Sequence, residues 1–249
     1  METSHILTWN VDWFRNGKRS GEQGEYLEED SSAEVYTSIV SVVKKFLEND
    51  NAIVFLQEVP VKAKGEKWHN HFLYKQLYKD FPEKTYNIFI NDEGFFTRCT
   101  IGISKKGVFE KADIGVLEDN RTIAVQKKGK TYIGTHMPTG FEKNDDNCKK
   151  WDTLLSFVKK NKSKLVICGD FNVYVGCEEK LTEEYYLKLL EYMDNYVDEH
   201  EFTYIGQTSI DKILLCKNEM ETSVDNLEFQ KNFELSDHKY VVVEIKDRE

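Results

Sequence analysis

Polar side chains with catalytic chemistry recur where the strongest strand-like runs of this sequence end or begin. The five motifs lie at residues 8–10 (TWN), 56–58 (LQE), 135–136 (TH), 169–172 (GDFN) and 236–238 (SDH). Loops at strand ends, held by a rigid sheet, are where catalytic groups tend to sit. Chance would have to place such groups at five separate positions, so the set indicates one shared site.

Each motif also has an ordinary structural explanation when it is taken singly. Glu58 could be the first exposed residue after an apolar strand, and Asp170 could be a turn residue, because Gly, Asp and Asn all favour turns. Asp237 could cap a turn, while His136 could be a loop residue and His238 a satisfied core histidine. These explanations lose weight when the five positions are considered together.

Together, these side chains are of the types that could hydrolyse a phosphate ester. The Glu58 carboxylate and the Asn10 amide oxygen are ligands that suit Mg²⁺, which prefers oxygen and keeps several waters. Asp170 can orient or deprotonate an attacking water. His136 and His238 can contact phosphoryl oxygens as these gain charge.

Two other hydrolase classes fit the sequence poorly. A zinc protease would carry H-E-x-x-H, but His69 and His71 are only two residues apart with no acid in register. A serine hydrolase of the common type would carry G-x-S-x-G, which does not occur.

The composition excludes further classes. Of the 249 residues, 40% are hydrophobic and 13% aromatic, which is enough for a sizeable core. No apolar run approaches the roughly 18 to 20 residues of a membrane span, and no secretory signal is visible. The formal charge of −10 argues against a protein that coats DNA through its whole surface. We therefore expect an intracellular protein, cytoplasmic or nuclear, that does not associate with membranes.

The cysteines and the absence of linkers bear on organisation. No pair among the five cysteines has C-x-x-C spacing, which disfavours a zinc ribbon and a redox motif and favours reduced thiols. We find no internal repeat and no stretch rich in Pro, Gly or Ser. We therefore predict a single domain over residues 1–249, acting as a monomer.

The periodicity predicts alternating strands and helices. Strand-like runs occupy residues 5–11, 52–56, 85–90, 100–104, 121–126, 130–135, 164–168, 209–216 and 240–245. Amphipathic helical spacing appears in residues 35–46, 151–158 and 186–193, and more weakly in 72–77. Runs 53–56 and 165–168 are apolar on both faces, so helices must cover the sheets. We predict an α/β fold, a four-layer α-β-β-α sandwich of two mixed sheets packed face to face with helices outside, and leave the strand order open.

With these motifs in place, the chain resembles the endonuclease/exonuclease/phosphatase superfamily of Mg²⁺-dependent phosphoesterases. The resemblance rests on residues 53–60 (IVFLQEVP), 168–172 (CGDFN), 209–214 (SIDKIL) and 235–239 (LSDHK), in the expected order. Within it, the chain is most similar to type 2 tyrosyl-DNA phosphodiesterases, which release tyrosine from a 5′ phosphate of DNA. Residues 8–12 (TWNVD) and 91–97 (NDEGFFT) carry that finer similarity.

The chain departs from that family where the family contacts DNA. Tyr174 stands in place of one family arginine, and Thr139 begins a segment that replaces a Ser-Thr-Arg run. Phe95 replaces a tyrosine and can stack but cannot donate a hydrogen bond. These changes predict a weaker grip on DNA.

The resemblance implies a role for each motif residue. Glu58 binds Mg²⁺, which Mn²⁺ can replace, with help from Asn10 and, through water, Asp237. Asp170 orients and deprotonates the water, and Asn172 holds that water or a phosphoryl oxygen in line. His238, paired with Asp211, and His136 donate to phosphoryl oxygens.

Further residues are expected around the substrate. Arg121 resembles the superfamily arginine near the phosphate, or else forms a surface salt bridge. Asp12, Phe95, Thr139 and Tyr174 are candidate substrate contacts. Lysine pairs at 62 and 64 and at 105 and 106 adjoin motif segments and could form a basic rim, although such runs are usually only solvated.

We therefore expect a phosphodiesterase that acts on nucleic acid, with a 5′-tyrosyl adduct on a single-stranded DNA end as the favoured substrate. A general or abasic-site nuclease and a small-molecule phosphatase remain alternatives, because the shared chemistry is indifferent to what lies beyond the phosphate. A non-catalytic binding module is disfavoured because the central polar groups are all present.

Overall fold

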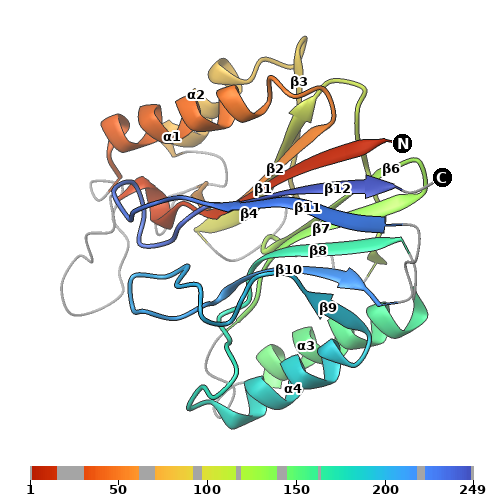
Figure 1. Cartoon of the computed structure of the whole chain (residues 1–249). Coiled ribbons are helices and arrows are strands. Elements are labelled where there is room, and N and C mark those ends of the chain that lie inside the picture. Colours follow the sequence, from red (N-terminus) through yellow and green to blue (C-terminus); the bar gives the residue numbers. More distant parts are fainter. Residues whose placement is uncertain are drawn as a thin grey trace.

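The computed structural model describes residues 2–15, 31–61, 71–91, 97–115, 119–138, 145–161, 164–217 and 222–247 (Figure 1). Within these ranges two six-stranded sheets pack face to face. Helices lie on the outer face of each sheet, so Figure 1 shows four layers, with α1 and α2 above the sheets and α3 and α4 below them. This arrangement confirms the predicted α-β-β-α sandwich.

The first sheet has the order β11-β12-β1-β2-β4-β3. Its strands are β1 (Thr3–Asn10), β2 (Ala52–Pro60), β3 (Tyr86–Phe89), β4 (Arg98–Lys105), β11 (Thr222–Phe229) and β12 (Val241–Asp247). The central strands β1 and β2 are parallel, and the other neighbours are antiparallel. A short 3-10 helix, η1 (Asp12–Phe14), follows β1 directly.

The second sheet repeats this plan with the order β5-β6-β7-β8-β10-β9. Its strands are β5 (Glu110–Lys111), β6 (Thr122–Lys127), β7 (Lys130–His136), β8 (Leu165–Asp170), β9 (Met193–Asn195) and β10 (Asp211–Cys216). Here β7 and β8 form the central parallel pair. Each sheet therefore has two central strands whose carboxyl ends meet at one edge.

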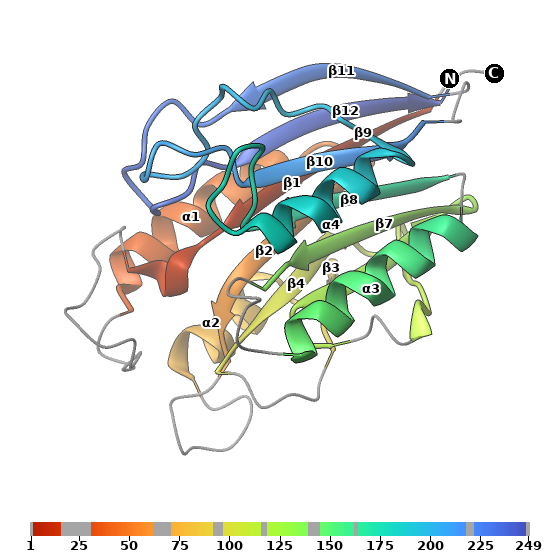
Figure 2. The ribbon, with the colours of Figure 1, turned by 90° about the horizontal axis from the view of Figure 1, so that it is seen from below.

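Three apolar clusters separate the four layers. One lies between the first sheet and α1 (Ala33–Phe46) and α2 (Phe72–Asp80). A second lies between the other sheet and α3 (Asp145–Lys160) and α4 (Lys180–Leu190), which run side by side in Figure 2. The third joins the two sheets, and β2 and β8 are buried along their whole lengths.

The sheets approach closely where a glycine faces an aromatic ring. A Cβ on Gly134 of β7 would lie 2.3 Å from the Phe55 ring of the opposite sheet. Only glycine therefore allows Phe55 to fill this part of the inter-sheet core. Side chains cap the outer helices: Ser32 Oγ accepts from the Val35 amide, and His71 Nδ1 accepts from the Leu73 amide.

The elements differ from the predicted ones at a few places. The helical spacing predicts that Met193 lies on a helix. In the structure α4 ends at Leu190, and Met193 begins the edge strand β9. Strands β5, β9 and β11 were not predicted, because all three are edge strands and carry little apolar alternation. Among the described residues, no helix has the length and apolar character needed to cross a bilayer.

Candidate active site

Strand register brings the predicted catalytic residues to the same edge of the two sheets. In the parallel β7–β8 pair His136 is opposite Asp170, and in the antiparallel β8–β10 pair Asp211 is opposite Asp170. Asn10, at the end of β1, pairs in register with Gln57 of β2, next to Glu58. The carboxyl ends of four central strands therefore meet here, on the left in Figure 1.

Asp170 of the second sheet makes polar contacts with residues of both halves of the molecule. The Asn10 side-chain amide donates to Asp170 Oδ2 across the sheets at 3.0 Å, and the Asn172 backbone amide donates to Oδ1 at 2.8 Å. The Nε2 atoms of His136 and His238 each lie 3.7 Å from Oδ2. Burial raises the pKa of Asp170 to about 7, and the Asp211 carboxylate adds to the rise while protonated His238 opposes it.

A charged pair holds His238. Its Nδ1 lies 2.9 Å from Asp211 Oδ2, and both side chains are buried. Burial alone would lower the pKa of His238, but the carboxylates of Asp211 and Asp170 outweigh burial and raise this pKa to about 10. The imidazole is therefore a cation at neutral pH.

Neutral groups fix the backbone around this pair. Thr203 Oγ1 accepts from the Asp211 amide at 3.0 Å, and Trp9 Nε1 donates to the His238 carbonyl at 3.0 Å. Ser236 Oγ donates to the Asn10 carbonyl at 2.7 Å, which ties the loop before β12 to the end of β1. Thr203 had no signal in the sequence beyond its place before the SIDKIL motif.

Glu58 reaches the site because β2 is irregular. The register between β2 and β4 shifts between Leu56 and Val59, and Glu58 has a left-handed backbone with φ of 57°. Bulges of this kind redirect a side chain next to active sites. Glu58 Oε1 then lies 3.6 Å from His136 Nε2, and Oε2 is paired with the Arg98 guanidinium.

The side of the site formed by β1 and the loop before β12 is anionic. Burial and the Asp237 carboxylate raise the pKa of Asp12 to about 7; the paired Arg15 opposes this rise and Glu58 adds to it. Asp12 and Asp237 are both buried. Close, buried carboxylates of this kind are stabilised by a cation.

The donor set fits a hard divalent cation. Glu58, Asp237 and Asn10 offer only oxygen ligands, and Mg²⁺ binds proteins through one or two carboxylates while it keeps several waters. Within the described ranges, no three His, Cys, Asp or Glu side chains converge as a metal site by themselves. Two carboxylates and one amide oxygen fit an ion that keeps several of its waters.

The opposite side of the site is cationic. Burial lowers the pKa of His136 well below its usual value, and the charges of Arg121, Arg98 and Lys150 lower it further. Lys150 Nζ lies 2.7 Å from Asp119, whose other oxygen accepts from the Arg121 amide at 2.9 Å. The site is thus divided into an anionic half and a cationic half.

Arg98 and Lys150 were missed in the sequence. Arg98 opens β4 directly after the 91–97 segment, so a charged residue at a strand start was the available signal. Lys150 lies in α3 among other lysines and had no distinguishing signal. Arg121, which the sequence analysis names, is half-buried, and its carbonyl accepts from the His136 amide; its contact with a phosphate stays a prediction.

The remaining predicted residues have three different outcomes. Tyr174 packs against the apolar cluster beneath α3 and α4, and its half-buried ring has a structural role there. Phe95 and Thr139 lie outside the described residues. Lys105 and Lys106 lie at the end of β4 opposite Arg98, so they cannot form a rim around this site.

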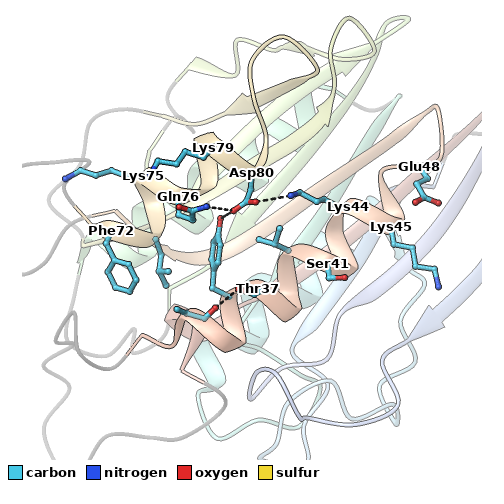
Figure 3. A pocket seen from close by; sticks show the side chains of 14 residues that line it. Thr37, Ser41, Lys44, Lys45, Glu48, Phe72, Lys75, Gln76, Lys79 and Asp80 are labelled. Atoms are coloured by element: carbon cyan, nitrogen blue, oxygen red, sulfur yellow. Dashed lines mark hydrogen bonds and ion pairs between the residues drawn. The ribbon is translucent and has the colours of Figure 1, made fainter.

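A separate groove of about 950 Å³ lies between α1 and α2 (Figure 3). Asp80 lies on its floor, where it accepts from the Tyr36 hydroxyl, Lys44 and Gln76. The groove is on the outer face of the first helical layer and contains none of the converging polar residues described above.

The chain is similar to known proteins in its three-dimensional structure. No family model and no curated protein matches the sequence. An AP endonuclease from Archaeoglobus fulgidus has a TM-score of 0.63 and 20% identity over 96% of this chain and 98% of its own. A D. rerio TDP2 complexed with single-strand DNA product has a TM-score of 0.61 and 14% identity, over 99% and 100%.

An endonuclease/exonuclease/phosphatase from Bacteroides vulgatus is also similar, with a TM-score of 0.64 and 15% identity over the full length of both chains. At these identities the comparisons establish the fold. The chain has the endonuclease/exonuclease/phosphatase fold, in agreement with the resemblance carried by its motifs.

Proposed function

We propose that this chain is a metal-dependent phosphodiesterase that acts on nucleic acid. The observation that carries the proposal is the contact across the two sheets at Asp170, where Asn10, His136 and the His238–Asp211 pair converge. A buried base, a buried cationic imidazole and a carboxylate for a metal ion are the parts that phosphoryl transfer requires.

Asp170 is the candidate base for the attacking water. A pKa of about 7 is close to the optimum for a general base near neutral pH. Asn10 and Asn172 each donate to one of its oxygens, so its orientation is fixed before substrate binds. Asn172 is itself held by donation from its side chain to the Met137 carbonyl at 2.9 Å.

The two histidines have different charges and therefore different tasks. His238 is cationic because of Asp211, so it can neutralise charge that develops on a phosphoryl oxygen. His136 stays neutral because burial and nearby cations, first of all Arg121, lower its pKa, so it can offer a hydrogen bond without adding charge.

Glu58, with Asn10 and Asp237, would hold the divalent ion. When bound, Mg²⁺ supplies charge neutralisation at the phosphate and the leaving oxygen, and Mn²⁺ is expected to replace it. Every other role belongs to side chains of the chain itself.

We further propose a DNA end with a 5′-tyrosyl adduct as the substrate. The likeness to two TDP2 structures, one of them with single-strand DNA product, supports this choice together with the TWNVD and NDEGFFT motifs. Residues 203–205 run beside the 237–239 segment, through hydrogen bonds from the Ile205 amide to Asp237 and from the Lys239 amide to Thr203. Phe202 and Ile205 are exposed on this strip and could pack against a base.

Other DNA substrates remain in competition. The solved structures with this fold also include the AP endonuclease, a 3′ phosphatase from Neisseria bound to product DNA hairpin, and the endonuclease domain of the retrotransposon TRAS1. The chemistry at the phosphate is shared, so the walls around it decide the substrate.

One panel of substrates tests the proposal. Purified protein is assayed with 5′-phosphotyrosyl single-stranded DNA, abasic duplex, plain single-stranded DNA, RNA and a nucleotide phosphate, each with Mg²⁺, with Mn²⁺ and with EDTA. We expect metal-dependent cleavage that is fastest on the phosphotyrosyl substrate. Replacement of Asp170 or Glu58 by Ala should lower kcat about 1000-fold, or ~4 kcal/mol.

The outcomes separate the proposal of a phosphodiesterase from the proposal of a 5′-tyrosyl substrate. Full activity of Asp170→Ala would contradict the phosphodiesterase proposal itself. Equal kcat/KM on phosphotyrosyl and internal phosphodiester bonds would leave the phosphodiesterase standing and remove the 5′-tyrosyl assignment.

A further inference from the structure

Arg98 lies next to Glu58, the candidate metal ligand, although it belongs to none of the sequence motifs. It opens β4 beyond the bulge of β2, where its Cα is opposite Pro60. Its guanidinium pairs with Oε2 of Glu58, and its side chain is 19% exposed. The carboxylate that suits a metal ion therefore already has a cation of the chain on one oxygen.

A network of neutral hydrogen bonds fixes Arg98 next to Arg121. The Asn120 side-chain amide donates to the Arg98 carbonyl at 2.9 Å, and the Thr100 amide donates to the Asn120 carbonyl at 2.7 Å. Thr100 Oγ1 then donates to the Arg121 carbonyl at 2.8 Å. The start of β4 and the start of β6 are thus one hydrogen-bonded unit that carries both arginines.

This unit holds three cationic side chains close together. Arg98, Arg121 and Lys150 face the carboxylates of Glu58 and Asp119, with Asp170 nearby, so a divalent cation that took Glu58 would leave positive charge in excess here. Like charges held together in this way are costly unless an anion joins them. A phosphate group is the anion that the proposed function brings to this edge.

We propose that Arg98 is a phosphate-binding residue that exchanges its contact with Glu58 for a contact with the substrate phosphate. The inference rests on the proposed function. A guanidinium has five donors in a planar fork, which suits bidentate binding of a phosphate, and Arg98 is partly exposed toward solvent. Arg121, whose carbonyl accepts from Thr100 Oγ1 and from the His136 amide, forms the fixed arm of the same anion site.

The exchange couples the two ligands of the site. A divalent cation on Glu58 competes with Arg98 for the same carboxylate, and the displaced guanidinium then needs an anion. Binding of the metal should therefore strengthen binding of the phosphate, and by linkage the phosphate should strengthen binding of the metal to the same extent. Removal of Arg98 should abolish most of this coupling.

Binding measurements on the full chain test the inference without turnover. Mn²⁺ affinity is measured by electron paramagnetic resonance without DNA. Affinity for a 5′-phosphorylated single-stranded oligonucleotide is measured by fluorescence anisotropy in EDTA and in Ca²⁺. For Arg98→Ala we expect Mn²⁺ to bind severalfold more tightly and the oligonucleotide in Ca²⁺ to bind roughly tenfold more weakly.

Two further variants make the comparison specific. Arg98→Lys keeps the charge but loses the fork, so it should lie between wild type and Arg98→Ala in oligonucleotide affinity. Lys79→Ala removes one charge from an exposed position on α2 (Figure 3), and both affinities should stay within about twofold of wild type. If Arg98→Ala lowers the melting temperature sharply, Arg98→Lys and Arg98→Gln carry the test.

The results distinguish this inference from the proposed function. Weaker Mn²⁺ binding by Arg98→Ala, or unchanged oligonucleotide affinity, would show that Arg98 only orients Glu58 and would overturn the inference. Opposite shifts in the two affinities would support it even if the protein hydrolysed none of the substrates in the panel.

Discussion

At the scale of single residues, the site depends on backbone conformations that L-amino acids rarely adopt. Glu58 and Asn172 have φ angles of 57° and 52°, and Gly169 has a φ of 134°. Left-handed conformations cost roughly 1 kcal/mol or more for residues with a side chain, and such strain gathers at functional sites. The bulge at Glu58 and the turn at Asn172 are therefore conformations that the surrounding sheets must impose.

Gly169 is the residue whose replacement should be most damaging to stability. A Cβ there would lie 1.9 Å from the Thr135 carbonyl oxygen of β7. We expect Gly169→Ala to lower the free energy of unfolding by about 4 kcal/mol or more, measured by urea denaturation. Gly176→Ala is the control, because its φ of 90° is also left-handed but nothing lies within 4 Å, so about 1–2 kcal/mol is expected. Equal losses would show that the contact with β7 is not the cause.

Asp211 should act on the reaction through His238. Asp211→Asn keeps the shape of the pair but removes the anion that holds the imidazole as a cation. We expect kcat to fall about 100-fold, or ~3 kcal/mol, with little change in KM. A rise in KM with kcat preserved would instead place Asp211 in substrate binding. The melting temperature reports whether the variant is folded.

At the same scale, the residue types and the pair of His238 with Asp211 could be predicted, but the contact of Arg98 with Glu58 could not. Asp170, His136 and His238 could be chosen because catalytic residue types recur at five strand ends, although each residue alone has an ordinary structural explanation. Arg98 could not be chosen, because an arginine at the start of a strand is common and its contact with Glu58 depends on the bulge in β2. A bulge without a glycine leaves no mark in the sequence.

At the scale of elements, helices and central strands were predictable because their apolar residues repeat with a clear period. The edge strand β11 (TSVDNLEF) has its own bulge between Asp225 and Glu228 and exposes much of its surface. Strand β9 has three residues, too few for any period to appear. Their positions follow from pairing with β12 and β10, which is a long-range property.

The outer helices of the first layer are joined by one polar cluster that can be tested. Asp80, the last residue of α2, accepts from Tyr36 and Lys44 of α1 at 2.9 Å each (Figure 3). Asp80→Ala leaves the buried Tyr36 hydroxyl without this acceptor, so we expect a loss of about 1–3 kcal/mol in urea denaturation. The loss should shrink in a Tyr36→Phe background, and Lys79→Ala should change stability by less than ~0.5 kcal/mol.

The same cluster should depend on pH in a defined direction. Burial acts to raise the pKa of Asp80, but hydrogen bonds from Lys44, Tyr36 and Gln76 outweigh burial and lower it from 3.8. A lowered folded pKa stabilises the protein above the unfolded pKa, and this contribution is lost as the pH falls through the folded value. The difference in stability between wild type and Asp80→Ala should therefore be full at pH 7 and shrink below about pH 4. A difference that stays constant to pH 2 would contradict a charged Asp80.

At the scale of the whole molecule, the two sheets repeat one plan, and the site forms where their central parallel pairs end together. The layer order was predictable from strands that are apolar on both faces. The pairing order within each sheet was not, because it joins segments as distant as β1 and β12. The prediction of one domain over residues 1–249 stays a prediction.

The distribution of charge over the whole molecule predicts a weak dependence of DNA binding on salt. The net charge is −10, and three lysines away from the site are already paired: Lys105 with Asp50, and Lys127 and Lys128 with Glu2. Among the described residues, Arg98 and Arg121 carry positive charge beside His136 at the site, and Lys150, also beside His136, is paired with Asp119.

Each phosphate contact on a single strand contributes about −0.7 to the slope of log K against log salt, so two arginines give about −1.4. Anisotropy titrations of a single-stranded oligonucleotide between 50 and 300 mM KCl, with Ca²⁺ held constant, measure this slope. Arg98→Ala should make it shallower by about 0.7, whereas Lys79→Ala should leave it unchanged. Two arginine contacts release few counterions from the DNA. A wild-type slope of about −4 or steeper would therefore mean that the strand contacts a much larger basic surface than these two arginines provide, and it would contradict the prediction.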